Sequence, residues 1–247
     1  MWKNKKISIV FSTYNEKNSV KKCIEELFET GVVDEIIAVN NNAEKGTDEE
    51  IQKCIQKGLN VKLVHEFRQG FGWGYRRALY EGSGDILIMI EPDGTFVPGD
   101  IFKLLAYCDD FDVVFGTRTT SIMVREGANM GFFMKIGNWA VAKIVEFLFM
   151  TTLLTDVGCT YRLIKKEVYE KIKGDFVIGG NEFNLDMMLQ IIRHGIKYIE
   201  IPLNYQKRVG ESSVTGSFKK TIKVGINMII LALQHKFNVI KSGRQKW

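Results

Sequence analysis

Two carboxylates one residue apart form the sharpest chemical feature of the sequence. Glu91 and Asp93, separated by Pro92 and followed by Gly94, come directly after the largely apolar run 85–90 (DILIMI). Residues i and i+2 of an extended chain point the same way, so both carboxylates can face one cation. Hard divalent ions take such oxygen ligands and keep positions open for substrate phosphates. The alternative is an acidic turn closed by Pro and Gly, and the spacing alone favours that turn.

Polar residues that suit a nucleotide follow three other apolar runs. Residues 12–16 (STYNE) follow the run 6–11, three asparagines at 40–42 follow the run 35–39, and a glycine-rich segment at 70–76 follows the run 61–65. Amide side chains read base edges and ribose hydroxyls, and glycines let backbone N–H groups approach a phosphate. The glycine segment is weak evidence by itself, because it lacks the G-x-G-x-x-G spacing of dinucleotide-binding loops.

Hydrophobic periodicity predicts the elements that would position these residues. The four apolar runs are expected to be strands, alternating with helices over residues 15–30, 48–58 and 72–81. This alternation predicts an α/β fold with a mostly parallel central sheet and helices on both faces. Ligands bind at the carboxyl ends of strands in such sheets, so the polar segments should meet at one edge. The second half is less regular, with expected strands at 112–116, 161–163 and 198–201 and helices at 127–154, 184–194 and 217–241.

Length and composition limit the class of protein. A chain of 247 residues that is 45% hydrophobic, with 3 prolines, is expected to form one globular domain with appended elements. The four cysteines, Cys23, Cys54, Cys108 and Cys159, form no Cys-x-x-Cys pair and are expected to be reduced core thiols in a cytosolic chain. The first residues lack a signal-peptide core, and no apolar stretch reaches the roughly 20 residues that span a bilayer.

The net charge of +5 is unevenly distributed. Residues 205–247 carry nine Lys or Arg against one acid, which gives +8 there and −3 for the rest. Such a tail suits phosphates, nucleic acid or anionic lipid, although a solvated cationic helix is about as consistent with the charge. A nucleic-acid role is least favoured, because the tail's apolar residues repeat at helical spacing.

The ordered motifs resemble family 2 glycosyltransferases with the GT-A fold, in particular polyprenyl- or dolichyl-phosphate sugar synthases. The resemblance runs from residue 7 to about residue 216. In chain order, it rests on STYNE at 12–16, VNNNAEKGT at 39–47, RQGFGWGYR at 68–76, GSGD at 82–85, EPD at 91–93, GTR at 116–118, DVGCTYR at 156–162, EFNLD at 182–186 and RVGESS at 208–213. Asn40 and Glu91 each stand where the family usually has Asp.

The resemblance implies a role for each motif. It implies a nucleoside-diphosphate sugar donor, GDP-mannose or a UDP-hexose, and a Mg²⁺ or Mn²⁺ ion held by Glu91 and Asp93. The nucleotide-binding residues it implies are Thr13, Tyr14, Asn15, Glu16, Asn40, Asn42, Gly70, Gly72 and Arg76. Asp93, Arg208 and Asp156 are the implied catalytic residues, with Arg208 closing over the diphosphate. Acceptor binding is assigned to Arg118, Arg125, Arg162, Glu182 and Asp186.

The expected reaction is inverting transfer of the sugar to a polyprenyl or dolichyl phosphate at the cytoplasmic membrane face. A phosphate acceptor is already ionised and needs positive charge, whereas a hydroxyl acceptor would need a base, for which Glu182, Asp186 and Asp156 are candidates. Two alternatives stay open, a family member with a saccharide hydroxyl acceptor and a non-catalytic nucleotide-sugar-binding protein.

Two segments are expected to bind the membrane surface. Residues 131–153 and 217–241 combine large apolar side chains with lysines, which is typical of helices that lie in the plane of a membrane. We therefore expect a GT-A domain over residues 1–216 and a basic amphipathic tail over 217–247, peripheral on the inner face of the membrane. A separate membrane-protein partner or a homo-oligomer is compatible with this organisation.

Overall fold

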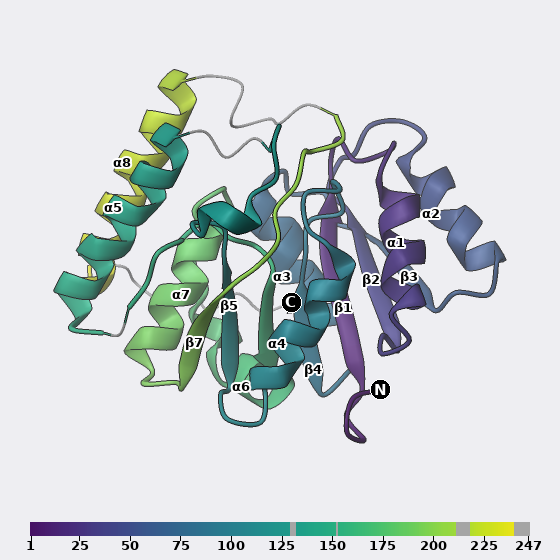
Figure 1. Ribbon diagram of the computed structural model, residues 1–247, viewed down its shortest axis with the longest axis horizontal. Helices are drawn as coiled ribbons and strands as arrows, with labels where there is room; N and C mark the ends of the chain where they lie inside the picture. The colour runs from purple at the N-terminus through teal and green to yellow at the C-terminus, as the bar shows by residue number, and fades with distance from the viewer. Residues whose placement is uncertain (129–131, 152, 211–217, 240–247) are drawn as a thin grey trace.

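The computed structural model describes residues 1–128, 132–151, 153–210 and 218–239 of the chain. A seven-stranded sheet in the order β3-β2-β1-β4-β6-β5-β7 forms its centre (Figure 1). The strands are β1 (Ile7–Thr13), β2 (Glu35–Asn40), β3 (Val61–His65), β4 (Ile86–Met89), β5 (Val113–Thr117), β6 (Arg162–Lys165) and β7 (Tyr198–Pro202). Their apolar side chains form the buried core, and β4 is buried along its whole length.

The sheet is mixed, because one strand runs against its neighbours. The first four strands pair in parallel, as predicted, and so do β5 and β7. β6 lies antiparallel between β4 and β5, and its first residue, Arg162, pairs with Met89 and Phe115 near the carboxyl ends of those strands. The chain therefore enters β6 from the carboxyl edge of the sheet. This direction brings residues 156–160 to the same edge as the carboxylates that follow β4.

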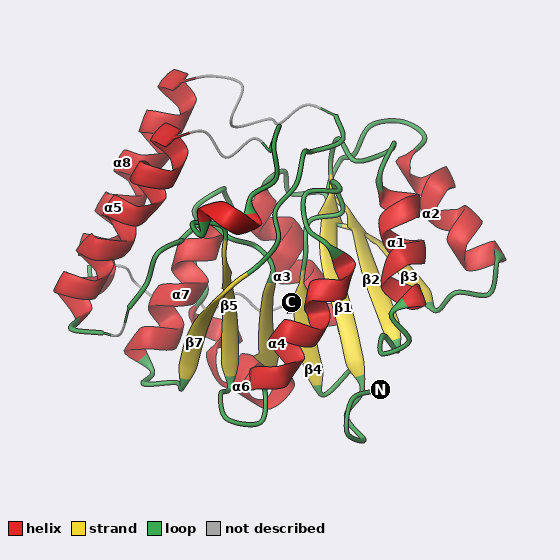
Figure 2. Cartoon of the chain, in the orientation of Figure 1, coloured by secondary structure: helices red, strands yellow, loops and turns green. Residues whose placement is uncertain are grey.

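Helices cover both faces of the sheet, with α4 in front and α3 behind in the view of Figure 2. The helices are α1 (Val20–Glu29), α2 (Thr47–Gln56), α3 (Phe71–Glu81), α4 (Ile101–Tyr107), α5 (Phe132–Phe149), α6 (Lys166–Ile172), α7 (Phe183–Arg193) and α8 (Phe218–Lys236). The sequence analysis did not predict α4 and α6, which have only seven residues each. Two helical turns are too short to establish a hydrophobic period. All four cysteines are buried and free, as predicted.

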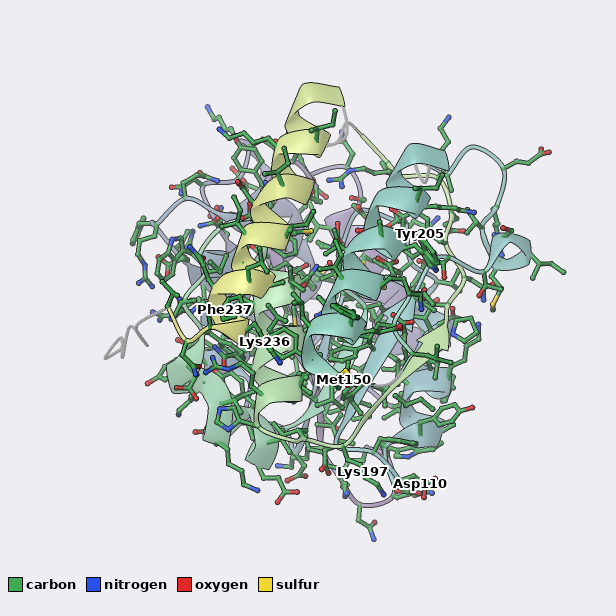
Figure 3. The ribbon with its side chains drawn as sticks, turned by 90° about the vertical axis from the view of Figure 1, so that its left-hand side faces the viewer. Asp110, Met150, Lys197, Tyr205, Lys236 and Phe237 are labelled. Atoms are coloured by element: carbon green, nitrogen blue, oxygen red, sulfur yellow. The ribbon has the colours of Figure 1, made fainter. Side chains whose placement is uncertain are left out.

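The two long amphipathic helices, α5 and α8, lie side by side at one end of the sheet (Figures 1 and 3). Near their C-terminal ends the Lys236 ammonium lies 5.7 Å from the centre of the Phe149 ring. α8 is also fixed to α7, since buried His235 lies 3.1 Å from the carboxylate of Asp186 and Asn227 donates to Glu182. Among the described residues, no helix has both the length and the apolar character required to cross a membrane.

Candidate active site

A cavity of about 440 Å³ opens at the carboxyl edge of the sheet. The ends of β1 and β4 and the loop before α3 line one side of it, as the strand-alternation pattern predicted. The opposite side is lined by α5, α7 and α8. The residues of the first side include Ser12, Thr13, Tyr14, Asn15, Glu16, Asn41, Gln69, Gly70, Phe71, Tyr75, Glu91, Pro92 and Arg208, together with Thr160, which is hydrogen-bonded to Glu91; those of the second include Arg118, Gly137, Asn138, Val141, Asn184, Val224, Gly225 and Met228.

A cluster of three carboxylates around one arginine lies beside this cavity. The guanidinium of Arg208 is bound to Glu16, and its Nη1 lies 2.8 Å from Asp93 Oδ2 and 3.9 Å from Glu91 Oε2. The backbone fixes this arrangement, because the N–H of Val209 donates to the carbonyl of Asp93. Glu91 and Asp93 therefore both face the charge of Arg208, although residues 92–94 form a bend and not the extended chain that the i and i+2 argument assumed.

The cluster shifts the pKa of its members. Burial and the charge of Asp93 raise the pKa of Glu91 to about 7, partly opposed by a hydrogen bond from Thr160 and by nearby arginines. Burial alone would lower the pKa of Arg208, but the charges of Asp93, Glu16 and Glu91 outweigh it and raise this pKa. The arginine is thus held in its charged form among carboxylates that need a cation.

The donor set fits a hard divalent ion. One oxygen of each carboxylate, Glu91 Oε2 and Asp93 Oδ2, faces the positive charge at Arg208 Nη1, at 3.9 and 2.8 Å. Carboxylate oxygens are also the ligands that Mg²⁺ and Mn²⁺ prefer. In the part of the chain that the structure describes, no three His, Cys, Asp or Glu side chains are grouped to hold a metal. A divalent ion at this point would have two carboxylates from the protein, and its other positions would be left to phosphates and water.

The loop after β1 forms the wall next to the acidic cluster. Glu16 accepts hydrogen bonds from the backbone N–H groups of Tyr14 and Asn15, which closes this loop into a tight turn. The Tyr14 ring stays 43% exposed while lining the cavity, so it offers a flat surface to a ligand. Thr13 is buried and donates to the carbonyl of Val39 at the end of β2.

Of the three asparagines after β2, the middle one lines the cavity. Asn41 is buried, donates to the carbonyls of Glu66 and Arg68, and accepts from the N–H of Gly70. Asn40 donates to Asp48 and accepts from the N–H of Ala43, so both ends of its amide are engaged. Asn42 has a left-handed backbone (φ 57°) and donates to the carbonyl of Phe67. Asn41 is thus the one of these three asparagines that lines the cavity, and the nucleotide-binding role of Asn40 and Asn42 stays a prediction.

Part of the glycine-rich segment allows α3 to pack closely against residues 178–180. The N–H groups of Gly72 and Trp73 donate to the carbonyls of Gly180 and Gly179, so neither points to a phosphate. A Cβ at residue 72 would lie 2.7 Å from the carbonyl of Ile178. Arg76 is buried with its guanidinium 4.6 Å from the Trp73 ring centre. Gly70 lines the cavity, but Gly72 and Arg76 do not, because close helix packing uses them.

On the opposite side of the cavity, Arg118 is held by Asp156. The guanidinium Nε and Nη2 of Arg118 lie 2.8 and 2.9 Å from the two carboxylate oxygens of fully buried Asp156. Burial alone would raise the pKa of Asp156, but the Arg118 charge and hydrogen bonds lower it. Asp156 does not line the cavity but holds Arg118, which does, and its catalytic role stays a prediction.

Four other predicted acceptor residues lie away from the cavity lining. Arg162 is completely buried, and its guanidinium donates to the carbonyls of Cys159, Asn184 and Val157, so it braces the loop before β6. Arg125 is exposed and donates to Gln206. Asp186 is buried, accepts from the N–H groups of Val177 and Ile178 and lies 3.1 Å from His235, and Glu182 accepts from Asn227. Asp186 and Glu182 thus anchor neighbouring segments, and their acceptor-binding role stays a prediction.

The structure adds cavity residues that the sequence analysis did not assign. Asn138 of α5, Asn184 of α7 and Thr160 line the cavity, and so does Tyr75, which donates to the carbonyl of Ile90. For Thr160, the available signal was its position inside the motif at residues 156–162. Asn138 lies in an apolar helix, where an isolated amide was the only indication.

The mixed seven-stranded sheet, with a cavity at its carboxyl edge, is the GT-A architecture of glycosyltransferases. The profile of the family described as "Glycosyl transferase family 2" matches residues 8–173. This chain belongs to that family, and it is a glycosyltransferase.

Two curated relatives and two solved structures of one synthase are informative. The chain is 23% identical over 222 residues to an undecaprenyl-phosphate mannosyltransferase of Micrococcus luteus, covering 85% of this chain and 88% of that protein. It is also 23% identical to the low-salt glycan biosynthesis hexosyltransferase Agl6 of Haloferax volcanii, covering 84% of this chain and 49% of that protein. Glucosyl-3-phosphoglycerate synthase from Mycobacterium tuberculosis, solved with Mn²⁺, UDP and its product, superposes with a TM-score of 0.69 at 16% identity, covering 97% of this chain and 82% of that one. A structure of the same synthase with Mg²⁺ and UDP has a TM-score of 0.70 at 15% identity, with the same coverage.

Proposed function

We propose that this enzyme transfers a hexose from a nucleoside-diphosphate sugar to a polyprenyl phosphate, with inversion and with the help of a divalent ion. The main observation behind this proposal is that one cavity reaches from the charged residues to the two amphipathic helices. Glu91 and Arg208 lie on one side of it, and the amphipathic helices α5 and α8 form its opposite wall. A polar reaction centre thus lies next to elements suited to a lipid. The Micrococcus relative, named for undecaprenyl phosphate, supports this choice of acceptor.

The carboxylates of the site favour a phosphate acceptor over a hydroxyl. Among the described residues that line the cavity, the carboxylates are Glu16 and Glu91, and both are engaged with Arg208 or Thr160. The other predicted bases, Asp156, Asp186 and Glu182, are used in structural contacts. An ionised phosphate needs no base, and its charge suits Arg118 and Arg208.

In the proposed reaction, an acceptor phosphate oxygen bonds to the anomeric carbon while the bond from that carbon to the donor diphosphate breaks. Glu91 and Asp93 would hold Mg²⁺ or Mn²⁺, and what such an ion supplies is positive charge at the leaving diphosphate. Arg208 would then move from the carboxylates to the phosphate oxygens and add a second cation there. The rest of its motif, residues 211–213, lies outside the described residues.

We further infer that α5 and α8 attach the enzyme to the membrane surface. The exposed apolar side chains on the pair are Ile136, Trp139, Phe147, Ile222, Ile226, Ile230 and Leu233, and Met150 and Leu153 after α5 and Phe237 after α8 are exposed as well. Figure 3 views this pair face-on, with Met150 at the end of α5 and Lys236 and Phe237 at the end of α8. The net charge of +8 over residues 205–247 would add attraction to anionic lipids on the cytoplasmic face. Because α8 also lines the cavity, we propose that the tail from residue 217 works as part of the catalytic unit.

Product analysis tests the proposal. UDP-glucose, UDP-galactose, UDP-N-acetylglucosamine and GDP-mannose are first screened by thermal shift with and without Mn²⁺, since donor binding should raise the melting temperature. The best donor is then offered undecaprenyl phosphate in vesicles and, separately, a set of soluble saccharides. We expect a lipid-phosphate hexose and no saccharide product. Transfer to a saccharide alone would favour the hydroxyl-acceptor alternative, and binding without turnover would favour a nucleotide-sugar sensor.

A further inference from the structure

Residues 156–162 form a motif whose predicted functional members, Asp156 and Arg162, are buried away from the cavity. Thr160 is the member of this motif that contacts the acidic cluster. It is fully buried from water, it lines the cavity, and its hydroxyl lies 2.6 Å from Glu91 Oε1. Because β6 enters the sheet from its carboxyl edge, the residue two positions before this strand lies beside the end of β4.

The direction of the hydrogen bonds around Thr160 follows from its neighbour Asn184. The Asn184 amide nitrogen lies 2.8 Å from Thr160 Oγ1 and 3.0 Å from the carbonyl oxygen of Gly158. That nitrogen can only donate, so the Thr160 oxygen accepts from it and gives its own single proton to Glu91. A directed chain therefore runs from Asn184 of α7 through Thr160 to the carboxylate.

This chain fixes one oxygen of Glu91 and leaves the other for a cation. Oε1 accepts from Thr160, while Oε2 is the oxygen that lies 3.9 Å from Arg208 Nη1. Asp93 has the same arrangement. Its Oδ1 accepts from the N–H and hydroxyl of Thr95, and its Oδ2 faces Arg208 Nη1. Each carboxylate is thus oriented by a threonine hydroxyl on one side and presented to the same point on the other.

We propose that Thr160, supported by Asn184, is a positioning residue that orients Glu91 toward the divalent ion. The proposal rests on the proposed function, which assigns a metal ion to this point.

The contact with Thr160 also gives a reason for Glu at position 91. An aspartate there would withdraw the carboxylate by about one C–C bond, about 1.5 Å, and a hydroxyl now at 2.6 Å would fall out of hydrogen-bond range. Glu has one more rotatable bond to restrain than Asp, and the Thr160 hydroxyl restrains it.

The first test measures the affinity for Mn²⁺, by electron paramagnetic resonance of the free ion, alone and in parallel with UDP or GDP. Thr160→Val keeps the side-chain shape and removes the hydroxyl, and we expect it to weaken Mn²⁺ binding about tenfold, as loss of a ligand-orienting partner does. Thr160→Ser keeps the hydroxyl and should stay within about twofold of the wild type. Thr155→Val is the matched control, since the Thr155 hydroxyl donates to a different buried carboxylate, that of Glu200, at 2.7 Å.

The outcomes separate the two proposals. If the wild type binds Mn²⁺ and Thr160→Val binds it equally well, or if Thr155→Val weakens it as much, the positioning role is overturned and the metal site stands. If the wild type binds no Mn²⁺ under any of these conditions, the proposed metal dependence fails, and the positioning role fails with it. Thermal unfolding of each variant verifies that the compared proteins are folded.

A double-mutant cycle gives a second, independent readout. If Thr160 acts through Glu91, Thr160→Val should have almost no further effect on Mn²⁺ affinity once Glu91→Asp has removed their contact. The two changes would then be strongly non-additive, with the double variant within about twofold of Glu91→Asp alone. Additive losses would show that Thr160 acts by some route other than Glu91 and would overturn the proposal.

Discussion

At the scale of single residues, the site consists of charged groups that other charged groups hold in place. Arg118 lines the cavity because Asp156 binds two of its nitrogens, and Arg208 lies among three carboxylates. Asp156 is in turn fixed by Glu200, which accepts from the backbone N–H groups of Thr155 and Asp156. Removing a supporting residue should therefore affect stability first and catalysis second.

Asp156→Ala tests this order of effects. The change leaves the Arg118 guanidinium buried without its partner, so we expect the free energy of unfolding to fall by about 3–5 kcal/mol. Urea unfolding followed by circular dichroism measures it. Asp109→Ala is the control, because the ion pair of Asp109 with Lys3 is exposed and its loss should hardly move the unfolding midpoint. A stable Asp156→Ala protein without activity would instead support a catalytic role for Asp156.

Glu200 makes a pH-dependent contribution to stability. Burial raises its pKa from the ordinary 4.5 to about 7, although hydrogen bonds from Thr155 and Asp156 oppose the shift. The folded protein thus binds this proton more tightly than the unfolded chain, so the contribution of Glu200 is most favourable below pH 4.5 and is lost as the pH rises through 7. The unfolding free energy of the wild type should therefore fall, relative to that of Glu200→Gln, between pH 5 and 8. A difference that is constant or grows with pH would contradict this assignment.

Much of the site could be predicted at the residue scale, but not the partner of each side chain. Glu91, Asp93 and residues 12–16 follow strands whose carboxyl ends must meet, so strand alternation predicted that they would lie together. Arg162 and Arg118 look equivalent in sequence, yet one is buried against carbonyls and the other lines the cavity. Burial of this kind depends on segments such as α7 that are distant in sequence, which local patterns do not encode.

At the scale of elements, periodicity predicted the strands and long helices but not the direction of β6. An antiparallel strand carries no local signature, because its direction follows from the edge at which the chain enters the sheet. The chain passes through α5 and then returns, along the loop after it, to the carboxyl edge of the sheet, where β6 begins. The same connection lets α5 and α8 form the outer wall of the cavity, so these helices belong to the site as much as the strand ends do.

The helix pair yields a prediction about membrane binding. Trp139 on α5 and Ile226 on α8 are about half exposed, and changing both to Glu should weaken binding to vesicles with anionic lipid by about tenfold or more. Phe102→Glu is the matched control, since Phe102 is 42% exposed on α4, away from the pair (Figure 1). Vesicle co-sedimentation at low and high salt measures binding, which salt should reduce but not abolish. Equal binding by the double variant would remove α5 and α8 from the membrane contact.

At the scale of the whole molecule, one sheet edge joins three functions. The strand ends carry the groups proposed to bind the donor, the loop before β6 orients Glu91 and Arg118, and α5 with α8 offers an apolar face beside the cavity. The GT-A fold thus places a highly charged cavity at the border of an apolar surface. An acceptor with a lipid tail and a charged head would reach the site without leaving the membrane.

The most direct test of this account is the product formed at a membrane. Wild-type protein, the best donor and Mn²⁺ are incubated with vesicles that contain undecaprenyl phosphate, and the lipids are analysed by mass spectrometry. We expect undecaprenyl phosphate to gain one hexose, and Asp93→Asn to lower the rate at least about a hundredfold while the protein stays folded, since it removes a metal-binding oxygen. A wild-type protein that turns over the donor but leaves the lipid phosphate unmodified, or an Asp93→Asn variant with nearly full activity, would contradict the account.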